Sequence, residues 1–386
     1  MLQKISEFVK KEVVLCVAMV LAVVSACWVH PDKEYIGYID FHTLAILFCL
    51  MCVMAGFRYI GVFQWIAGKL LNKVHKASDI VMILVMLCFF FSMFITNDVA
   101  LITFVPFTFV VGKMLGDDIY KKMVLFTVVL QTIAANLGSM LTPLGNPQNL
   151  YLYGISGLSL AAFIKVMLPY SMLSLVLLVI CCVLFGKKVN QMEASVAVEN
   201  GLKQSINPGE RKGSLTIYVI LFGMCLLTVA HIMPIWVTFI AVIIGMLITE
   251  YKELLHVDYA LLLTFVAFFI FIGNMGRIPA FANLLQEMIT GNEVAVSILA
   301  SQCISNVPAA LLLSGFTTNV SALLVGTNLG GLGTLIASMA SLISYKYVAA
   351  ESVASDIPGG KGKYFLQFTI SNICFLAALV VLYLCM

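Results

Sequence analysis

Apolar runs long enough to cross a lipid bilayer dominate this sequence and decide what it can fold into. A helix needs about 20 predominantly apolar residues to span hydrocarbon. Runs of this kind cover residues 13–29, 41–57, 123–153, 161–186, 214–231, 235–250, 257–274, 322–346 and 364–386. Of the 386 residues 62% are hydrophobic and 11% are charged, against about 45–50% and about 25% in soluble domains. The sequence therefore predicts an all-α integral membrane protein with nine spans.

Two further apolar stretches are too long for a single helix and are interrupted midway by polar residues. They cover residues 78–112 and 293–317. Non-helical backbone at membrane depth is tolerated only where it is buried in protein or lines a cavity. Each stretch is therefore predicted to be a re-entrant helical hairpin that enters the membrane and returns to the same side.

The positions of the basic residues predict the orientation in the membrane. Lys4, Lys10 and Lys11 precede the first span, and basic residues near helix ends favour the cytoplasmic side. With nine spans and two hairpins, the basic clusters of loops 187–213 and 346–363 fall on the same side as the N-terminus. We expect a multi-pass protein of a cell (inner) membrane, in contact with lipid, with a cytoplasmic N-terminus and a cytoplasmic linker at 187–213.

The two halves of the chain share short motifs in the same order. Residues 95–107 read ITNDVALITFVPF and residues 304–316 read ISNVPAALLLSGF, while 135–142 (ANLGSMLT) match 327–334 (TNLGGLGT). Asp40 and Asp258 also open corresponding spans. Because the charge pattern places the two hairpins on opposite sides, we predict two inverted-topology repeats. These are residues 1–186, with hairpin 78–112 and broken helix 123–153, and residues 214–386, with hairpin 293–317 and broken helix 322–346.

Inverted repeats place a binding site near the midplane, where broken helices expose unpaired backbone groups. Amides, hydroxyls and glycines at the hairpin tips and breaks are suited to bind an anion at helix N-termini, or a cation through carbonyl oxygens. The predicted substrate- and cation-binding residues are Thr96, Asn97, Asp98, Asn136, Gly138, Ser139, Thr142, Asn146, Ser305, Asn306, Val307, Thr327, Asn328, Gly330 and Thr334.

Asp98 is a carboxylate at a predicted intramembrane hairpin tip, which by itself suggests a function. It has no acidic counterpart, because Val307 occupies the matching position. Asp98 could bind Na⁺, carry a proton, pair with a buried base such as Arg277, or lie in a solvated vestibule without a specific role. Arg277 itself could hold an anion or anchor a helix end.

Other functional classes lack the residues they would need. The five histidines, at positions 30, 42, 75, 231 and 256, form no His-x-x-x-His pair, and no Gly-x-Ser-x-Gly motif is present. An intramembrane hydrolase requires such a nucleophile or metal site. The net charge of +3 gives no reason to expect nucleic-acid binding. We expect no enzyme activity and no cofactor apart from Na⁺ or H⁺ as coupling ion.

The two tip motifs, the Gly-Asn-Pro-Gln-Asn run at 145–149 and the Asn-Leu-Gly elements resemble the ion transporter superfamily. That group includes divalent-anion/sodium symporters, citrate transporters, arsenite permeases and D-type sodium/proton antiporters. The resemblance implies an elevator-type transporter that often forms a homodimer. It also implies Na⁺ sites at Asn97, Asp98 and Gly138 and at Asn306 and Gly330.

In the divalent-anion symporters the tip motif is Ser-Asn-Thr, whereas the third positions here are Asp98 and Val307. The function predicted from the sequence is secondary active transport of a small anion, such as the di- or tricarboxylate citrate, coupled to Na⁺ or H⁺ by alternating access. The alternative is a sodium/proton antiporter or an arsenite-type efflux permease.

Overall fold

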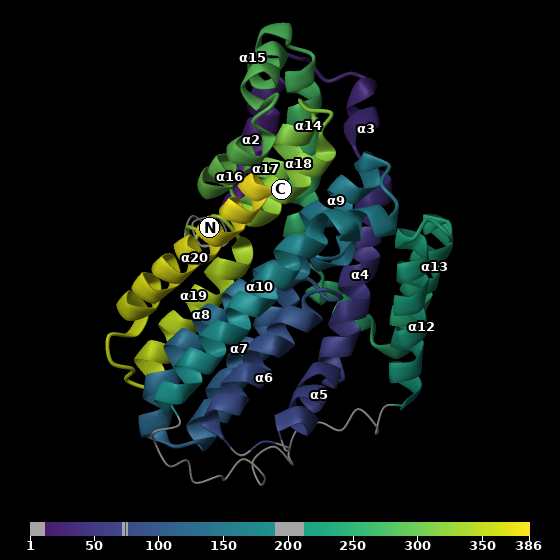
Figure 1. Cartoon of the computed structure of the whole chain (residues 1–386). Helices are drawn as coiled ribbons and strands as arrows, with labels where there is room; N and C mark the ends of the chain where they lie inside the picture. The colour runs from purple at the N-terminus through teal and green to yellow at the C-terminus, as the bar shows by residue number, and fades with distance from the viewer. Residues whose placement is uncertain (1–11, 72–73, 75, 190–211) are drawn as a thin grey trace, which may run out of the picture.

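The computed structural model describes residues 12–71, 74, 76–189 and 212–386, and within these ranges all regular secondary structure is helical (Figure 1). The N-terminal half contains α2 (Val13–Ser25), α3 (Glu34–Tyr38), α4 (Phe41–Tyr59), α5 (Val62–Leu71), α6 (Ala77–Phe91), α7 (Asn97–Met114), α8 (Asp117–Ser139), η1 (Pro143–Gly145), α9 (Pro147–Ser156) and α10 (Leu160–Val189). The C-terminal half contains α12 (Lys212–Val229), α13 (Ile235–Thr249), η4 (Tyr251–His256), α14 (Tyr259–Gly276), α15 (Pro279–Ile289), α16 (Glu293–Ile304), α17 (Asn306–Ser314), α18 (Val320–Leu329), α19 (Met339–Ala354) and α20 (Gly360–Cys385).

Among the described residues, seven helices are long and apolar enough to cross a membrane: α4, α7, α8, α10, α12, α14 and α20. Large apolar side chains are exposed along several of them, and Ile220 and Ile370 are each more than half exposed. Exposed apolar helix faces are what a lipid environment requires, because lipid tails are as apolar as the side chains that meet them. The chain is therefore a multi-span helical membrane protein.

The predicted interruptions are present, with sharper boundaries than the sequence gives. Stretch 78–112 forms α6 and α7 around a turn at residues 92–96, and stretch 293–317 contains α16 and α17, separated by Ser305 alone. Run 123–153 divides into α8 and α9, and run 322–346 into α18 and α19. The first run, 13–29, is helical only to Ser25, and the short helices α3, α5 and α15 were not predicted. Most of the predicted linker 187–213 lies outside the described residues.

Local chemistry explains the breaks. Pro143 opens η1 and Pro147 is the first residue of α9. Proline is tolerated at a helix start because that position needs no N–H donor, whereas inside a helix it removes a hydrogen bond. In the second break Gly330, Gly331 and Gly333 follow α18, and Gly333 has a φ of 109°, which glycine adopts at little cost. Proline thus causes the first interruption and glycine the second.

Each hairpin packs its first helix onto the neighbouring interrupted helix through glycine. A Cβ placed on Gly138 of α8 would lie 2.0 Å from the Phe89 carbonyl oxygen of α6. A Cβ on Gly330, which directly follows α18, would lie 2.6 Å from the Ser301 hydroxyl of α16. Small residues allow helix backbones to approach closely in membranes. The two hairpins are therefore seated on α8 and α18 by the same kind of contact.

The two halves interlock. Helix α2 packs on α14, while α12 and α13 pack on α4. Helix α9 packs against α17 and α18, and α19 packs against α7 and α8, so the second part of each interrupted helix lies against the hairpin of the other half. Asp40 and Asp258 cap α4 and α14 by accepting hydrogen bonds from the backbone N–H groups of Thr43 and Leu261, at 3.0 and 2.9 Å. This arrangement brings both hairpin tips and both breaks to the middle of the molecule (Figure 1).

We expect Gly138→Ala to destabilise the protein by about 1–3 kcal/mol, because the new methyl group meets a backbone carbonyl that cannot rotate away. Thermal unfolding of the detergent-solubilised protein measures the effect. Gly223→Ala in α12 is the matched control, since nothing lies within 4 Å of its Cβ position. Equal melting temperatures for the two variants would show that α6 and α8 are not in close contact at Gly138.

Candidate functional site

Four helix N-termini meet at a small cavity of about 10 Å³, roughly the space that one water molecule needs. Its lining comes from the starts of α7, α9, α17 and α19, with one residue from α14. The lining residues are Asn97, Asp98, Asn146, Pro147, Gln148, Leu261, Asn306, Val307, Ser338 and Met339. The structure thus brings the two hairpin tips and the two helix breaks together at one point.

Each of these N-termini contributes a partial positive charge at the cavity. Backbone N–H groups in the first turn of a helix have no intrahelical acceptor, and the aligned peptide dipoles add a partial positive charge there. The side chain of Thr96 caps α7 by accepting a hydrogen bond from the N–H of Val99, at 3.5 Å. No side-chain cap occurs at α9, α17 or α19. An anion in the cavity would meet several positive helix ends at once.

A buried amide pair links the first hairpin to both interrupted helices. The side-chain amide of Asn97 donates to the side-chain oxygen of Asn136, at 3.0 Å, and the hydroxyl of Ser338 donates to the same oxygen, also at 3.0 Å. The amide oxygen of Asn97 and the amide nitrogen of Asn136 have no partner among the described residues. Buried polar atoms normally have one, so this pair retains capacity for a ligand.

The first break is held by the polar residues predicted there. The amide of Asn146 donates to the hydroxyl of Ser139, at 2.6 Å, and that hydroxyl donates to the carbonyl of Asn136, at 2.9 Å. The hydroxyl of Thr142 donates to the carbonyl of Met93 in the hairpin turn. Of these residues, only Asn146 lines the cavity. Ser139 and Thr142 hold the first break in place through hydrogen bonds but do not line the cavity.

The second hairpin turns at a strained residue. Ser305 has a φ of 73° and a ψ of 155°, a backbone region occupied almost only by glycine. The N–H of Asn306 donates to the carbonyl of Ala337, at 3.0 Å, which ties the hairpin tip to the second break. Strain of this kind is characteristic of functional sites. Ser305 is thereby placed at the tip, and Asn306 and Val307 face the cavity.

The remaining predicted residues lie around the cavity but do not line it. Asn328 donates to the amide oxygen of Asn149, at 2.6 Å, and joins α18 to α9. Thr327 is buried and donates to a carbonyl of its own helix. Thr334 is exposed and bonds to Gln302 through its backbone N–H, at 2.9 Å. Gly138 and Gly330, described above, are packing residues of α8 and of the second break.

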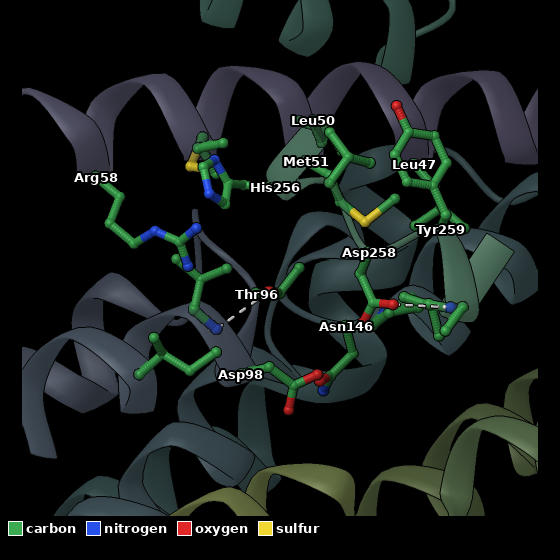
Figure 2. Close-up of a pocket in the computed structure, with 18 of the residues that line it drawn as sticks. Leu47, Leu50, Met51, Arg58, Thr96, Asp98, Asn146, His256, Asp258 and Tyr259 are labelled. Atoms are coloured by element: carbon green, nitrogen blue, oxygen red, sulfur yellow. Dashed lines mark hydrogen bonds between the residues drawn. The ribbon is translucent and has the colours of Figure 1, made fainter. Parts of the chain in front are cut away.

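A larger cavity of about 570 Å³ adjoins the small one (Figure 2). It lies between α4, the start of α7, the start of α9 and the segment from η4 to α14. Asp98 and Asn146 line both cavities. Arg58, His256 and Asp258 line only the larger one. The larger cavity therefore leads directly to the central site.

Asp98 lies at the junction of the two cavities, and its Oδ1 atom is buried without a hydrogen-bond partner among the described residues. Asp258 lines the larger cavity as the cap of α14, where its Oδ1 atom accepts from the N–H of Leu261. In Figure 2 the side chain of Asn146 lies between the two carboxylates. An ionised carboxylate without a partner is costly to bury, so Asp98 is set to receive a cation or a proton.

The suggested pairing of Asp98 with Arg277 is wrong. The guanidinium of Arg277 bonds to the carboxylate of Asp32, at 2.7 Å, and to the hydroxyl of Tyr38, at 3.0 Å. It also lies 3.5 Å from a carboxylate oxygen of Glu34. The Arg277 hydrogen bond holds the pKa of Asp32 below its usual value. Arg277 lines neither cavity and anchors the end of α14 to the segment before α4.

Several site residues were missed by sequence reasoning. Gln148 and Asn149 belong to the Gly-Asn-Pro-Gln-Asn motif at 145–149. Membership of this motif was the signal that could have identified them. Asp258 was noted only as the start of a span. Ser338 falls just beyond the matched segment 327–334, so no repeat pointed to it. The side-chain oxygen and nitrogen of Gln148 are both buried and unpartnered in the described part of the chain.

Within the described residues, no group of three or more His, Cys, Asp or Glu side chains could hold a metal ion. The predicted Na⁺ sites would draw instead on the Asp98 carboxylate and on amide and carbonyl oxygens, the hard ligands that such ions prefer. Asn97 fits this role, because its amide oxygen is unpartnered. The carbonyl of Gly330 already accepts a hydrogen bond from Gln302, at 2.9 Å. The second predicted ion site would have to share or replace that bond.

Comparison with known proteins identifies the family. The sequence pattern of the citrate transporter family (CitMHS) matches residues 1–343. The chain belongs to the citrate transporter family. It is 32% identical over 320 residues to the inner membrane protein YbiR of Escherichia coli, covering 81% of this chain and 82% of that protein. It is 31% identical to the uncharacterized transporter MJ0456 of Methanocaldococcus jannaschii, with the same coverages.

A more distant relative of this citrate transporter family member is the arsB transporter of Dictyostelium discoideum. It is 27% identical over 178 residues, which are 46% of this chain and 30% of that protein. These matches confirm the resemblance to the ion transporter superfamily. Together with the membrane-spanning helices, they show a membrane transporter and not an enzyme.

We expect Asn97→Ala and Asn306→Ala each to reduce transport to background, because both side chains face the cavity where the helix N-termini meet. Stability should change little for Asn97→Ala, since Ser338 still donates to Asn136. Uptake by reconstituted protein and thermal unfolding are the two measurements. Asn372→Ala is the matched control, because this buried asparagine bonds only within α20. Normal uptake by both cavity variants would contradict the site assignment.

Proposed function

We propose that this member of the citrate transporter family is a secondary active transporter of a small anion, namely a di- or tricarboxylate such as citrate, coupled to Na⁺ or H⁺ by alternating access. The observation that carries the proposal is the convergence of four helix N-termini, two from hairpin tips and two from helix breaks, on one small cavity. Helix N-termini bind carboxylates through backbone N–H groups and the helix dipole.

The size and chemistry of the two cavities support an anionic substrate. The larger cavity, of about 570 Å³, falls within the range of about 300–1,000 Å³ typical of small-molecule sites. The small cavity offers the amides of Asn97, Asn146, Gln148 and Asn306. Asn146 also lines the larger cavity, where such a neutral donor can contact a carboxylate without a fixed positive charge that would prevent its release.

Asp98 provides a physical reason for coupling. Its carboxylate lines both cavities, so an anionic substrate would be repelled while Asp98 is ionised and unpaired. A Na⁺ ion at Asp98 and the amide oxygen of Asn97, or a proton on Asp98, removes that repulsion. Anion and cation would then bind together, which is the thermodynamic requirement for symport.

Alternating access would follow from two inverted repeats, residues 1–186 and 214–386, arranged as an elevator. The paired Asp caps, the two hairpins and the two interrupted helices support this reading. The hairpins and interrupted helices would move against a scaffold of α2, α4 and α12–α14. The protein would lie in the inner membrane, with a cytoplasmic N-terminus, and would form a homodimer.

A second candidate function is sodium/proton antiport or arsenite-type efflux. One observation favours it: Asp98 and Asp258 are among the carboxylates that line the larger cavity. A pair of carboxylates can exchange Na⁺ for protons without any anion. One relative is named arsB, so the ligand screen below includes arsenite.

A ligand screen separates these functions. Thermal unfolding of the purified protein is followed with citrate, succinate, malate, tartrate, phosphate, sulfate and arsenite, each with and without Na⁺. A ligand that binds the folded state raises the melting temperature by mass action. Stabilisation by a carboxylate that requires Na⁺ or low pH, followed by its uptake into proteoliposomes, supports the symporter. Stabilisation by Na⁺ alone, with a pH dependence and no anion effect, supports the antiporter.

Asp98→Asn should abolish the dependence of transport on the coupling cation, because the amide has no charge to neutralise. We expect residual anion uptake that varies less than about twofold with Na⁺ and pH, where the wild type varies by tenfold or more, as one charge interaction of about 1.4 kcal/mol requires. Uptake rates across Na⁺ concentration and pH are the measurement. Asp118→Asn, at the start of α8, is the control substitution. Unchanged Na⁺ and pH profiles in Asp98→Asn would assign Asp98 a structural role.

A further inference from the structure

We propose that Arg58 forms a second anion site at one end of the larger cavity, where it captures a carboxylate or a similar small oxyanion separately from the central site. The inference rests on the proposed anion transport and adds to it a residue that determines affinity. Arg58 itself belongs to neither the hairpin motifs nor the helix breaks.

Arg58 occupies the last turn of α4 and is half-buried. It lines the cavity of about 570 Å³ together with His256. Figure 2 shows the Arg58 side chain leaving α4 and extending into the cavity near His256, with Asp98 and Asp258 farther along. Arg58 and His256 thus lie at one end of the cavity, away from the carboxylates of Asp98 and Asp258.

The charge of Arg58 is not neutralised within the described residues. The ion pairs found there are Lys113–Glu351, His256–Glu253, Arg277–Asp32 and Arg277–Glu34. None involves Arg58, although Glu12 also lines the cavity. A half-buried guanidinium with five N–H donors and no partner is costly. A ligand oxyanion would satisfy it.

Comparison with Arg277 shows that this lack of a partner is specific to Arg58. Both arginines lie at the end of a helix that begins with a capping aspartate. Arg277 is bound by the acidic residues of the segment before α4, including Glu34 of α3. The corresponding segment before α14 is η4, and its Glu253 instead lies 3.5 Å from His256. Arg277 therefore stabilises the fold, whereas Arg58 is available to bind a ligand.

The chemistry of arginine defines the ligand. The planar guanidinium matches the two oxygens of a carboxylate or another oxyanion and binds them with two parallel hydrogen bonds. Because Asp98 lines the same cavity, an anion held at Arg58 would advance to the central site only after Asp98 is neutralised. Arg58 would then raise the local anion concentration before the coupled step.

The test compares Arg58→Gln, Arg58→Lys and Arg277→Gln with the wild type. Counterflow of the anion identified in the screen is measured in inside-out vesicles, because the predicted topology places the end of α4 on the cytoplasmic side. We expect Arg58→Gln to raise KM by about 10- to 100-fold, the usual effect of losing a charged hydrogen-bond pair, with Vmax changed less than about twofold. The KM of Arg58→Lys should lie between those of the wild type and Arg58→Gln, since lysine keeps the charge but lacks the planar guanidinium that forms two parallel hydrogen bonds. Arg277→Gln should leave KM unchanged.

A salt series provides a second readout. With choline chloride as the added salt, the KM of the wild type should rise with ionic strength, and that of Arg58→Gln should not. An unchanged KM in Arg58→Gln while the wild type transports anions would overturn the Arg58 site and leave the proposed function intact. A similar rise in Arg277→Gln would also overturn it, because the effect would then be general surface charge.

Two further outcomes are decisive. If Arg58→Gln does not fold, as judged by gel filtration and thermal unfolding, the lysine variant decides, and a wild-type KM in Arg58→Lys overturns the use of the guanidinium fork. If the wild type moves none of the anions, the proposed function fails and the Arg58 site fails with it.

Discussion

The structure depends on satisfying backbone groups wherever a helix is interrupted inside an apolar protein. An unpaired carbonyl or N–H in hydrocarbon costs several kcal/mol, and this fold has two such interruptions. Side chains supply the missing bonds: Asn149 donates to the carbonyls of Ser139 and Thr142, and Gln302 donates to those of Gly330 and Leu332. The hairpins supply others, because the N–H of Asn306 bonds to Ala337. The polar centre of the molecule therefore stabilises its broken helices, and Asn306 both bonds to the second break and lines the small cavity.

Much of the architecture could be predicted from the sequence because lipid imposes simple rules. Apolar length locates helices such as α4, α8 and α20, and Pro147 and the glycines after Leu329 mark the breaks. Short helices such as α5 and α15 escaped prediction, since they are too short for a span. The resemblance of the tip motifs to a transporter superfamily was confirmed by the match to the citrate transporter family.

The site was harder to predict than the fold, because its residues come together from distant parts of the chain. Asn97 and Asn306 could be named from their motifs, and the structure places both at one cavity. Ser338 could not be named, since an isolated serine before a helix has no distinctive pattern, yet it bonds to Asn136 across more than 200 residues. Gly138 and Gly330 were predicted as binding residues, and the structure places both in close helix packing. Arg277 was a candidate partner for Asp98, but the acidic residues that bind it lie on a segment whose position only the fold reveals.

The two hairpin tips differ in mechanical character. Five residues, 92–96, separate α6 from α7, whereas Ser305 alone separates α16 from α17 and holds a conformation that non-glycine residues rarely adopt. A five-residue turn can change its backbone torsions without disturbing its helices. A one-residue turn that is already strained has no further torsions that can change in this way. Any displacement at the second tip must therefore be carried by α16 and α17 as a rigid lever. The two tips would then move in unlike ways, one compliant and one stiff, although their sequences look like copies of a single element.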